Sequence, residues 1–219
     1  MKKYLAALIC LPAFLGFAHA STITVFDSLG GTGETSLAFV YQAVPGTDYY
    51  SSLYASFSTV NPSFMLGDVK VNLMLTAPAA AGAGLDISLY RNSGTATPGS
   101  WMSLLGTISD SSLTTTPANY DFPVSPLALS PGRYWIGISS FDNSTAAWGV
   151  TYDTSGAGVM NEYFGDPNPN DKYFPNVGSN YSVALKMDVN GADVPEPSTI
   201  LLGAIGLAML AAYRRRVVS

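Results

Sequence analysis

Cysteine and histidine are almost missing from this chain of 219 residues, since Cys10 and His19 are the only residues of those types. Both lie within the first 20 residues, so a mature chain that begins after them has neither a thiol nor an imidazole. This excludes a disulfide framework, thiolate or histidine-dependent catalytic triads, and zinc sites built from sulfur or imidazole. The domain must instead be stabilised by its own core, for which about 170 residues are enough.

The first 20 residues have the pattern of a signal peptide. Lys2 and Lys3 precede 14 mostly apolar residues (4–17), and Ala18 and Ala20 form the small-x-small pattern cut by signal peptidase. We therefore expect a mature N-terminus at Ser21. An uncleaved membrane helix is the alternative, but this apolar run is short for a span and is interrupted by proline.

Charged residues are also few, at 11% of the chain. Residues 21–193 contain five basic residues against fourteen acidic ones, a formal charge of −9. So acidic a surface is expected to repel nucleic acid and anionic lipid rather than attract them, and we expect no nucleic-acid partner. Solubility outside the cell and affinity for divalent cations are the two explanations left open.

The middle of the chain predicts an all-β domain over residues 21–189. Apolar and polar residues alternate with period two, and Gly, Pro and Asn pairs mark turns between the runs. The expected strands are 22–27, 36–41, 52–59, 67–76, 85–91, 102–108, 120–124, 133–140, 147–152 and 181–189. So many short strands predict a two-sheet antiparallel sandwich of jelly-roll type.

Two segments interrupt the alternation. Residues 77–84 are Ala, Pro and Gly and predict a hairpin loop, whereas residues 153–179 predict a long loop rich in Gly, Asn, Asp and Pro. Long loops in compact domains are often functional, so the second is where we expect a ligand.

The end of the chain has three consecutive parts. A linker over 190–198 contains Pro195, Glu196 and Pro197, an apolar helix is expected over 199–213, and a basic tail over 214–219 begins with Arg214, Arg215 and Arg216. The arginines predict that this end stays in the cytoplasm. Residues 200–213 would cover only about 21 Å of a hydrocarbon layer of about 30 Å, which predicts a marginal, transient membrane anchor.

This arrangement resembles the PEP-CTERM tripartite sorting signal. The resemblance implies processing by an exosortase in a Gram-negative bacterium that makes exopolysaccharide, with release to the cell surface or the extracellular space. A permanent single-pass anchor is the main alternative, and a buried core helix or a glycolipid-anchor signal fits the terminal arginines poorly. Residues 52–189 resemble, more loosely, choice-of-anchor type surface domains, a family of β-sandwich modules.

No motif for nucleophilic catalysis occurs, so we expect a protein that is not an enzyme. A glycan-active enzyme that uses a carboxylate pair is the alternative, with Glu34 and Glu162 among its candidates.

A binding module is favoured, with exopolysaccharide as the expected partner, because sugar sites commonly combine aromatic faces with polar groups. The candidates are Trp148, Tyr163 and Tyr173, with Trp101 and Tyr152. A weaker hypothesis is a Ca²⁺ site at Asp166, Asn168 and Asn170, whose oxygens alternate as in a calcium loop but lack its glycine and glutamate.

Overall fold

The computed structural model describes residues 22–30, 35–40, 52–61, 64–79, 81–94, 96–166, 172–176, 184–193 and 206–207. Two units divide the chain, and residues 22–193 form one of them. The predicted signal peptide, the Pro-Glu-Pro segment and the arginine triplet lie outside the described residues, as does Glu34. In the ranges given above, no helix is long and apolar enough to cross a membrane.

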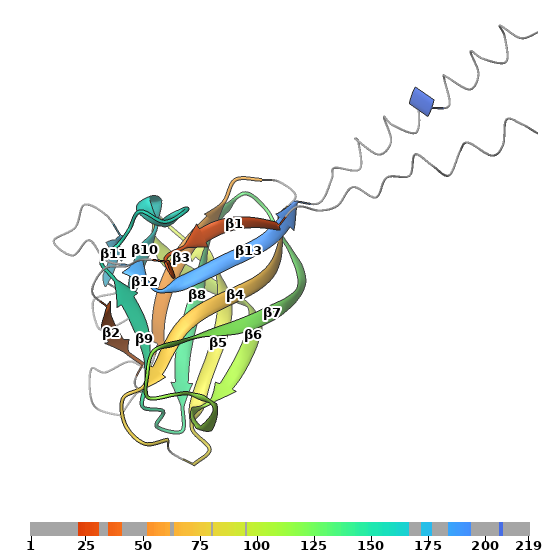
Figure 1. Ribbon diagram of the computed structural model, residues 1–219. Helices are drawn as coiled ribbons and strands as arrows, with labels where there is room; N and C mark the ends of the chain where they lie inside the picture. Colours follow the sequence, from red (N-terminus) through yellow and green to blue (C-terminus); the bar gives the residue numbers. More distant parts are fainter. Residues whose placement is uncertain are drawn as a thin grey trace, which may run out of the picture. The chain divides into compact units, whose positions relative to one another are not determined.

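The domain is a β-sandwich of two antiparallel sheets (Figure 1). In sheet A, the order β1-β13-β4-β9-β12 is extended by β2, which pairs with β9, and by β7, which pairs with β4. The strands of sheet A are β1 (Thr22–Asp27), β2 (Thr35–Phe39), β4 (Phe64–Leu75), β7 (Ala118–Leu129), β9 (Ala146–Thr151), β12 (Ala184–Leu185) and β13 (Met187–Asp193).

Sheet B has the order β11-β10-β3-β8-β5-β6. Its strands are β3 (Ser52–Thr59), β5 (Gly84–Ser93), β6 (Thr97–Ser109), β8 (Gly132–Phe141), β10 (Tyr163–Asp166) and β11 (Lys172–Pro175). Two short 3-10 helices, η2 (Asp110–Ser112) and η3 (Val159–Asn161), lie in the connections.

The core forms where the inner faces of the two sheets meet. In β4, Val69, Val71 and Leu73 are fully buried, whereas Lys70 between them is only partly covered. Successive side chains of a strand point to opposite faces, so one face of each strand supplies the core and the other is free for polar groups. The apolar cluster includes residues of both sheets, among them Phe57 of β3 and Ile87 of β5.

The predicted strands are largely confirmed, and two of them, 22–27 and 52–59, have the expected bounds. The expected loop over 153–179 is wrong in part, because it contains the hairpin β10–β11. The connection over 77–84 is not a hairpin loop, since β4 lies in sheet A, β5 lies in sheet B and Gly84 already belongs to β5. Strand β13 continues to Asp193, four residues past the predicted end of the domain, because it is paired on both sides, with β1 and with β4.

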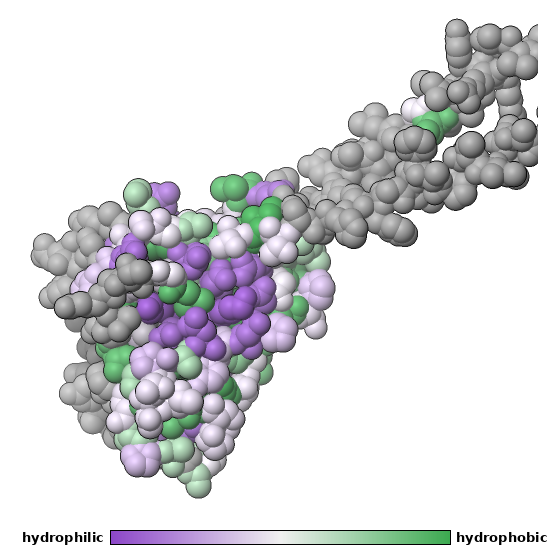
Figure 2. Space-filling view, viewed as in Figure 1, coloured by the Kyte–Doolittle hydropathy of each residue, from purple (hydrophilic) through white to green (hydrophobic). Residues whose placement is uncertain are grey.

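The outer face of sheet A carries a polar patch (Figure 2). One row across it pairs Asp27 with Asp188, Asp188 with Lys70, and Lys70 with Asp121. Lys70 Nζ lies 3.1 Å from Asp68 Oδ2, and this hydrogen bond raises the pKa of the lysine. Partial burial raises the pKa of Asp188, whose Oδ1 is buried without a hydrogen-bond partner.

Replacing Asp188 by Asn is expected to stabilise the domain at neutral pH. Because the pKa of Asp188 is raised in the folded state, ionisation of this carboxyl opposes folding, and the effect grows as the pH rises above the unfolded-state value of about 3.9. Because this carboxyl is partly exposed and solvent screens its charge, the free energy of unfolding should rise by only about 0.5 kcal/mol or less at pH 7. At pH 3, where the carboxyl is protonated in both states, it should change little. Urea unfolding at both pH values measures this, with the exposed Asp121→Asn as control; an equal gain at both pH values would contradict the assignment.

Candidate functional site

The outer face of sheet B carries a group of aromatic rings, called here the aromatic face. Its members are Tyr54, Tyr90, Trp101, Trp135, Tyr163 and Tyr173. The register explains how they meet. Trp135 of β8 pairs with Tyr90 of β5, and Tyr90 pairs with Trp101 of β6, so these three side chains lie in one row across three strands.

Four rings of the aromatic face contact one another edge to face. Tyr54 lies 5.3 Å from Tyr90 and 6.3 Å from Tyr173, and Trp135 lies 5.1 Å from Tyr173, as centroid distances. Such T-shaped pairs add to the stabilisation given by burial. Gly137 makes room for them, because a Cβ there would lie 2.6 Å from the ring of Tyr54 and 2.7 Å from that of Tyr90.

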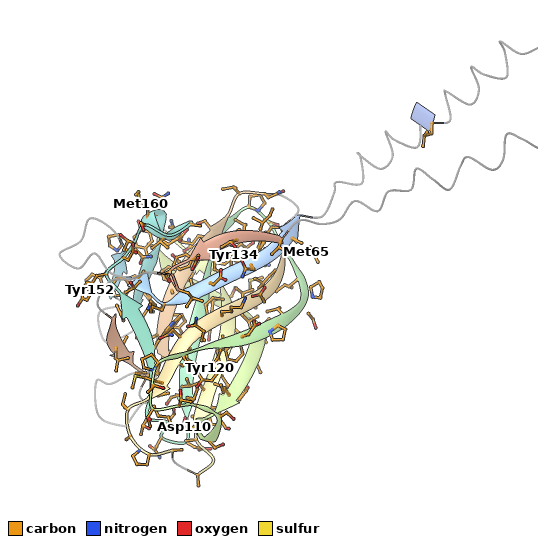
Figure 3. The ribbon with its side chains drawn as sticks, viewed as in Figure 1. Met65, Asp110, Tyr120, Tyr134, Tyr152 and Met160 are labelled. Carbon is orange, nitrogen blue, oxygen red and sulfur yellow. The ribbon has the colours of Figure 1, made fainter. Side chains whose placement is uncertain are left out.

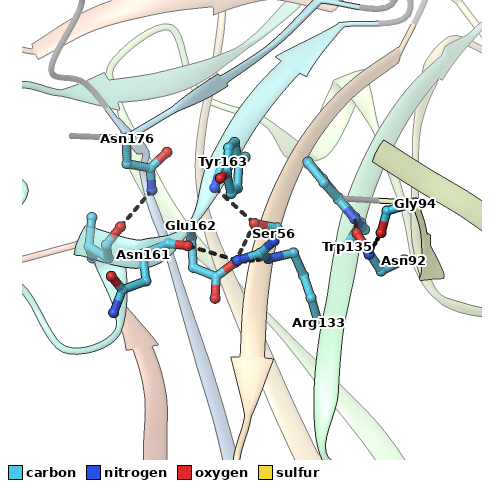
Figure 4. A network of polar contacts seen from close by, with 10 residues as sticks. Ser56, Asn92, Gly94, Arg133, Trp135, Asn161, Glu162, Tyr163 and Asn176 are labelled. Atoms are coloured by element: carbon cyan, nitrogen blue, oxygen red, sulfur yellow. Dashed lines mark hydrogen bonds and ion pairs between the residues drawn. The ribbon is translucent and has the colours of Figure 1, made fainter. Parts of the chain in front are cut away.

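Burial separates the base of this face from its surface. Trp135 is fully buried, and its Nε1 donates to Asn92 Oδ1 at 2.9 Å, while Asn92 Nδ2 donates to the carbonyl of Gly94 (Figure 4). Trp101 is 58% exposed, and its Nε1 lies 3.4 Å from Ser88 Oγ. Trp135 therefore supports the face, and Trp101 is the ring most accessible to a ligand.

The hydroxyl of Tyr90 stays neutral. Burial raises the pKa of Tyr90 to about 12, and the neighbouring Tyr54 adds to the increase. A neutral phenol can donate and accept a hydrogen bond, which suits it to a ligand that carries hydroxyl groups.

A buried carboxylate holds the hairpin β10–β11 on sheet B. Glu162 is 1% exposed, its Oε2 lies 2.9 Å from Arg133 Nε, and it accepts a hydrogen bond from Ser56 Oγ (Figure 4). Arg133 Nη2 also donates to the carbonyl of Asn161, and the backbone N–H of Tyr163 donates to Ser56 Oγ at 2.8 Å. We call Glu162, Arg133 and Ser56 the carboxylate clamp. It joins β3, β8 and the start of β10.

The carboxylate clamp positions part of the aromatic face. Arg133 Cζ lies 4.7 Å from the ring centroid of Tyr163, a cation–π distance. Gly165 of β10 pairs with Tyr54 on one side and with Tyr173 on the other, which brings Tyr173 over the sheet. The hairpin thus adds Tyr163 and Tyr173 to the rings of the central strands.

The structure places the predicted ligand-binding residues in different parts of the domain. Tyr163 and Tyr173 lie together on the aromatic face. Trp148 as a ligand residue is wrong, because it is fully buried in sheet A and its Nε1 donates to the carbonyl of Lys186 at 2.8 Å. Tyr152 is exposed but follows β9 of sheet A (Figure 3).

The calcium hypothesis is not tested. Asp166 ends β10, whereas Asn168 and Asn170 lie outside the described residues. Among the residues that the structure describes, no group of three or more Asp, Glu, His or Cys is arranged to hold a metal ion.

Tyr54 and Tyr90 are functional candidates that sequence reasoning did not identify. Each stands at an outward position of an alternating strand, next to buried Ala55 and Leu89. The alternation alone could have marked them as outward-facing aromatic residues. Their proximity depends on the pairing of β3 and β5 with β8, which is a long-range property.

The fold defines a β-sandwich protein that carries a group of aromatic rings on the outer face of one sheet. Residues 193–216 match the family model of the PEP-CTERM protein-sorting motif, which contains Pro195, Glu196, Pro197 and the arginine triplet. No curated protein matches the chain. The chain therefore carries a PEP-CTERM sorting motif after a β-sandwich domain, and this motif implies an exported protein sorted to the cell surface by an exosortase. The resemblance of residues 52–189 to choice-of-anchor domains stays a prediction.

Breaking the carboxylate clamp is expected to destabilise the domain. Glu162→Gln should lower the free energy of unfolding by about 1.5–3 kcal/mol, because the buried carboxylate loses its charge and the ion pair with the partly buried Arg133 is lost. Arg133→Met should cost a similar amount, and the double variant should cost much less than the sum of the two. Urea unfolding measures all three, with the exposed Arg91→Met as control. Additive effects would show that Glu162 and Arg133 are not coupled.

Proposed function

We propose that this protein is a non-enzymatic, exported component of the cell surface or extracellular matrix that binds polysaccharide through the aromatic face of sheet B. The observation that carries the proposal is the exposed Trp101 at one end of a row of rings that extends through Tyr90. Flat rings pack against the C–H faces of sugars, and nearby hydroxyl groups bind sugar hydroxyls.

The dimensions of the face suit a chain ligand rather than a single sugar. Trp101 lies on β6 and Tyr173 on β11, which are the two end strands of sheet B. Six strands at a spacing of about 4.8 Å span about 24 Å. A polysaccharide that lies across the strands would contact rings from β6, β5, β3, β10 and β11 in turn.

The charge of the domain favours a neutral or weakly charged polysaccharide. Residues 21–193 carry a formal charge of −9, which repels strongly anionic chains at low ionic strength. Arg133 is the basic side chain beside the ring of Tyr163, and its guanidinium already contacts Glu162 and Asn161.

The strand order supports the classification of this β-sandwich as a jelly roll. Strands β2-β9-β4-β7 in sheet A and β3-β8-β5-β6 in sheet B are the eight strands of two Greek keys, each paired with the neighbour that this topology requires. Strands β1, β12 and β13 extend sheet A, and β10 and β11 extend sheet B.

A glycan-active enzyme remains the alternative class. The contacts of Glu162 weigh against it, since its carboxylate is buried and held by Arg133 and Ser56. A catalytic carboxylate must reach its substrate, and this one supports a hairpin instead.

Removing the exposed ring is expected to weaken polysaccharide binding. Trp101→Ala should reduce affinity by about tenfold, because an exposed aromatic residue that anchors a ligand commonly supplies a large share of the binding energy. Tyr152→Ala is the matched control, an exposed aromatic residue that follows a strand of sheet A. A glycan array followed by titration calorimetry with the polysaccharide of the producing organism provides the measurement. Unchanged affinity of the Trp101 variant, or hydrolysis of the glycan that is lost in Glu162→Gln, would overturn the proposal.

Processing at both ends can be tested on the secreted protein itself. Mass spectrometry should give an N-terminus at Ser21 and a C-terminus near Glu196, since signal peptidase and exosortase remove the segments beyond these points. An extracellular form that still contains Arg214, Arg215 and Arg216 would show a permanent anchor instead.

A further inference from the structure

Strand β13 is paired on both sides up to Ala192, and its last residue, Asp193, is paired on one side. Ala192 pairs with Thr22 of β1 and with Met65 of β4, and Asp193 pairs with Phe64. Gly191 is buried, and a Cβ there would collide with the carbonyl oxygen of Met65 and with the ring of Phe64. Detaching this end would break ladders with two neighbours, so the strand is a fixed point of the chain.

The sorting motif follows this fixed point closely. Glu196 is three residues beyond Asp193, and an extended chain covers at most about 3.6 Å per residue. The Cα atom of Glu196 therefore lies within about 11 Å of that of Asp193. An enzyme that binds the Pro-Glu-Pro segment must reach the same end of the sandwich.

That end of the sandwich has an apolar hollow of about 290 Å³. Its lining includes Met65, Gly67, Pro126 and Ala192, with Thr22 and Asp68 at its polar part. Met65 is half-buried and lies beside the end of β13 (Figure 3). Pro126 of β7 is exposed. A small apolar recess in a polar face is suited to take up an anchoring side chain of a partner.

We propose that this hollow is a docking surface for the exosortase that processes the Pro-Glu-Pro segment. The occupant follows from chain length, because an enzyme that cuts near Glu196 must come within about 11 Å of Asp193. Signal peptidase must come equally close, at Ser21, since Thr22 pairs with Ala192. Slower removal of the signal peptide in variants of the hollow, with normal processing of the tail, would therefore overturn the proposal. The inference rests on exosortase processing of the tail. Docking would place the sandwich beside the enzyme and raise the effective concentration of the short segment between the strand and the membrane helix.

The experiment follows processing of the full-length chain in a bacterium that contains an exosortase. Pulse-labelled chains are separated into uncleaved and cleaved forms for the wild type, Met65→Lys and Pro126→Lys. Met160→Lys is the matched control, since Met160 is 64% exposed on η3, far from Met65 (Figure 3). Limited proteolysis of each exported variant checks that the sandwich is folded. A further chain carries Gly-Ser-Gly-Ser between Asp193 and Val194, with and without Met65→Lys.

Docking predicts that Met65→Lys and Pro126→Lys each slow processing at least threefold, whereas Met160→Lys does not. The spacer should slow it to a similar degree, and adding Met65→Lys to the spacer should have little further effect. Wild-type rates in both hollow variants, or faster processing with the spacer, would overturn the proposal. Glu196→Ala distinguishes a failure of the docking proposal from a failure of exosortase processing. A chain that is cleaved normally with this change would contradict exosortase processing itself.

Discussion

The domain depends on apolar contact between the inner faces of its two sheets. Residues 22–193 contain no cysteine and no histidine, so neither a disulfide nor an imidazole site reinforces this contact. Each fully buried Leu, Ile or Phe contributes about 1.5–3 kcal/mol, and side chains such as Phe57, Leu66 and Ile87 are completely covered. Because successive side chains of a strand point to opposite faces, the core takes every second residue. The residues that point outward can take other functions.

The outer faces of the two sheets differ in composition. Sheet A presents carboxylates around Lys70, whereas sheet B presents rings around Gly137. A ring layer outside the core needs support of its own, and the structure supplies it in two forms: the hydrogen bond from Trp135 to Asn92 and the carboxylate clamp around Glu162. Buried polar groups of this kind fix one arrangement, because an unpaired partner would be costly. They give the aromatic face a defined shape.

Local pattern predicted the strands well and the site only in part. Strand β3 could be predicted from alternation, whereas β9 is buried at every position because both of its faces are covered, so its Trp148 could not be recognised as a core residue. The hairpin β10–β11 has strands of four residues within a segment rich in turn formers. It is held by contacts such as Arg133 to Glu162, which are 29 residues apart. Neither the period-two alternation of apolar residues nor strand propensity reveals contacts between residues so far apart in the sequence.

The proposed binding through a face of sheet B, and not through an edge, agrees with the residues found in the edge strands β7 and β6. Strand β7 contains Pro123 and Pro126, which lack the N–H that a further strand would need. Strand β6 shifts register against β5 at three places, between Ile87 and Asn92. Prolines and bulges both discourage edge-to-edge pairing. A surface protein at high local density would otherwise add strands to its neighbours. Because β6 and β7 resist pairing in these ways, the binding proposed above would use the ring surface of sheet B and the hollow beside β13 rather than these two edges.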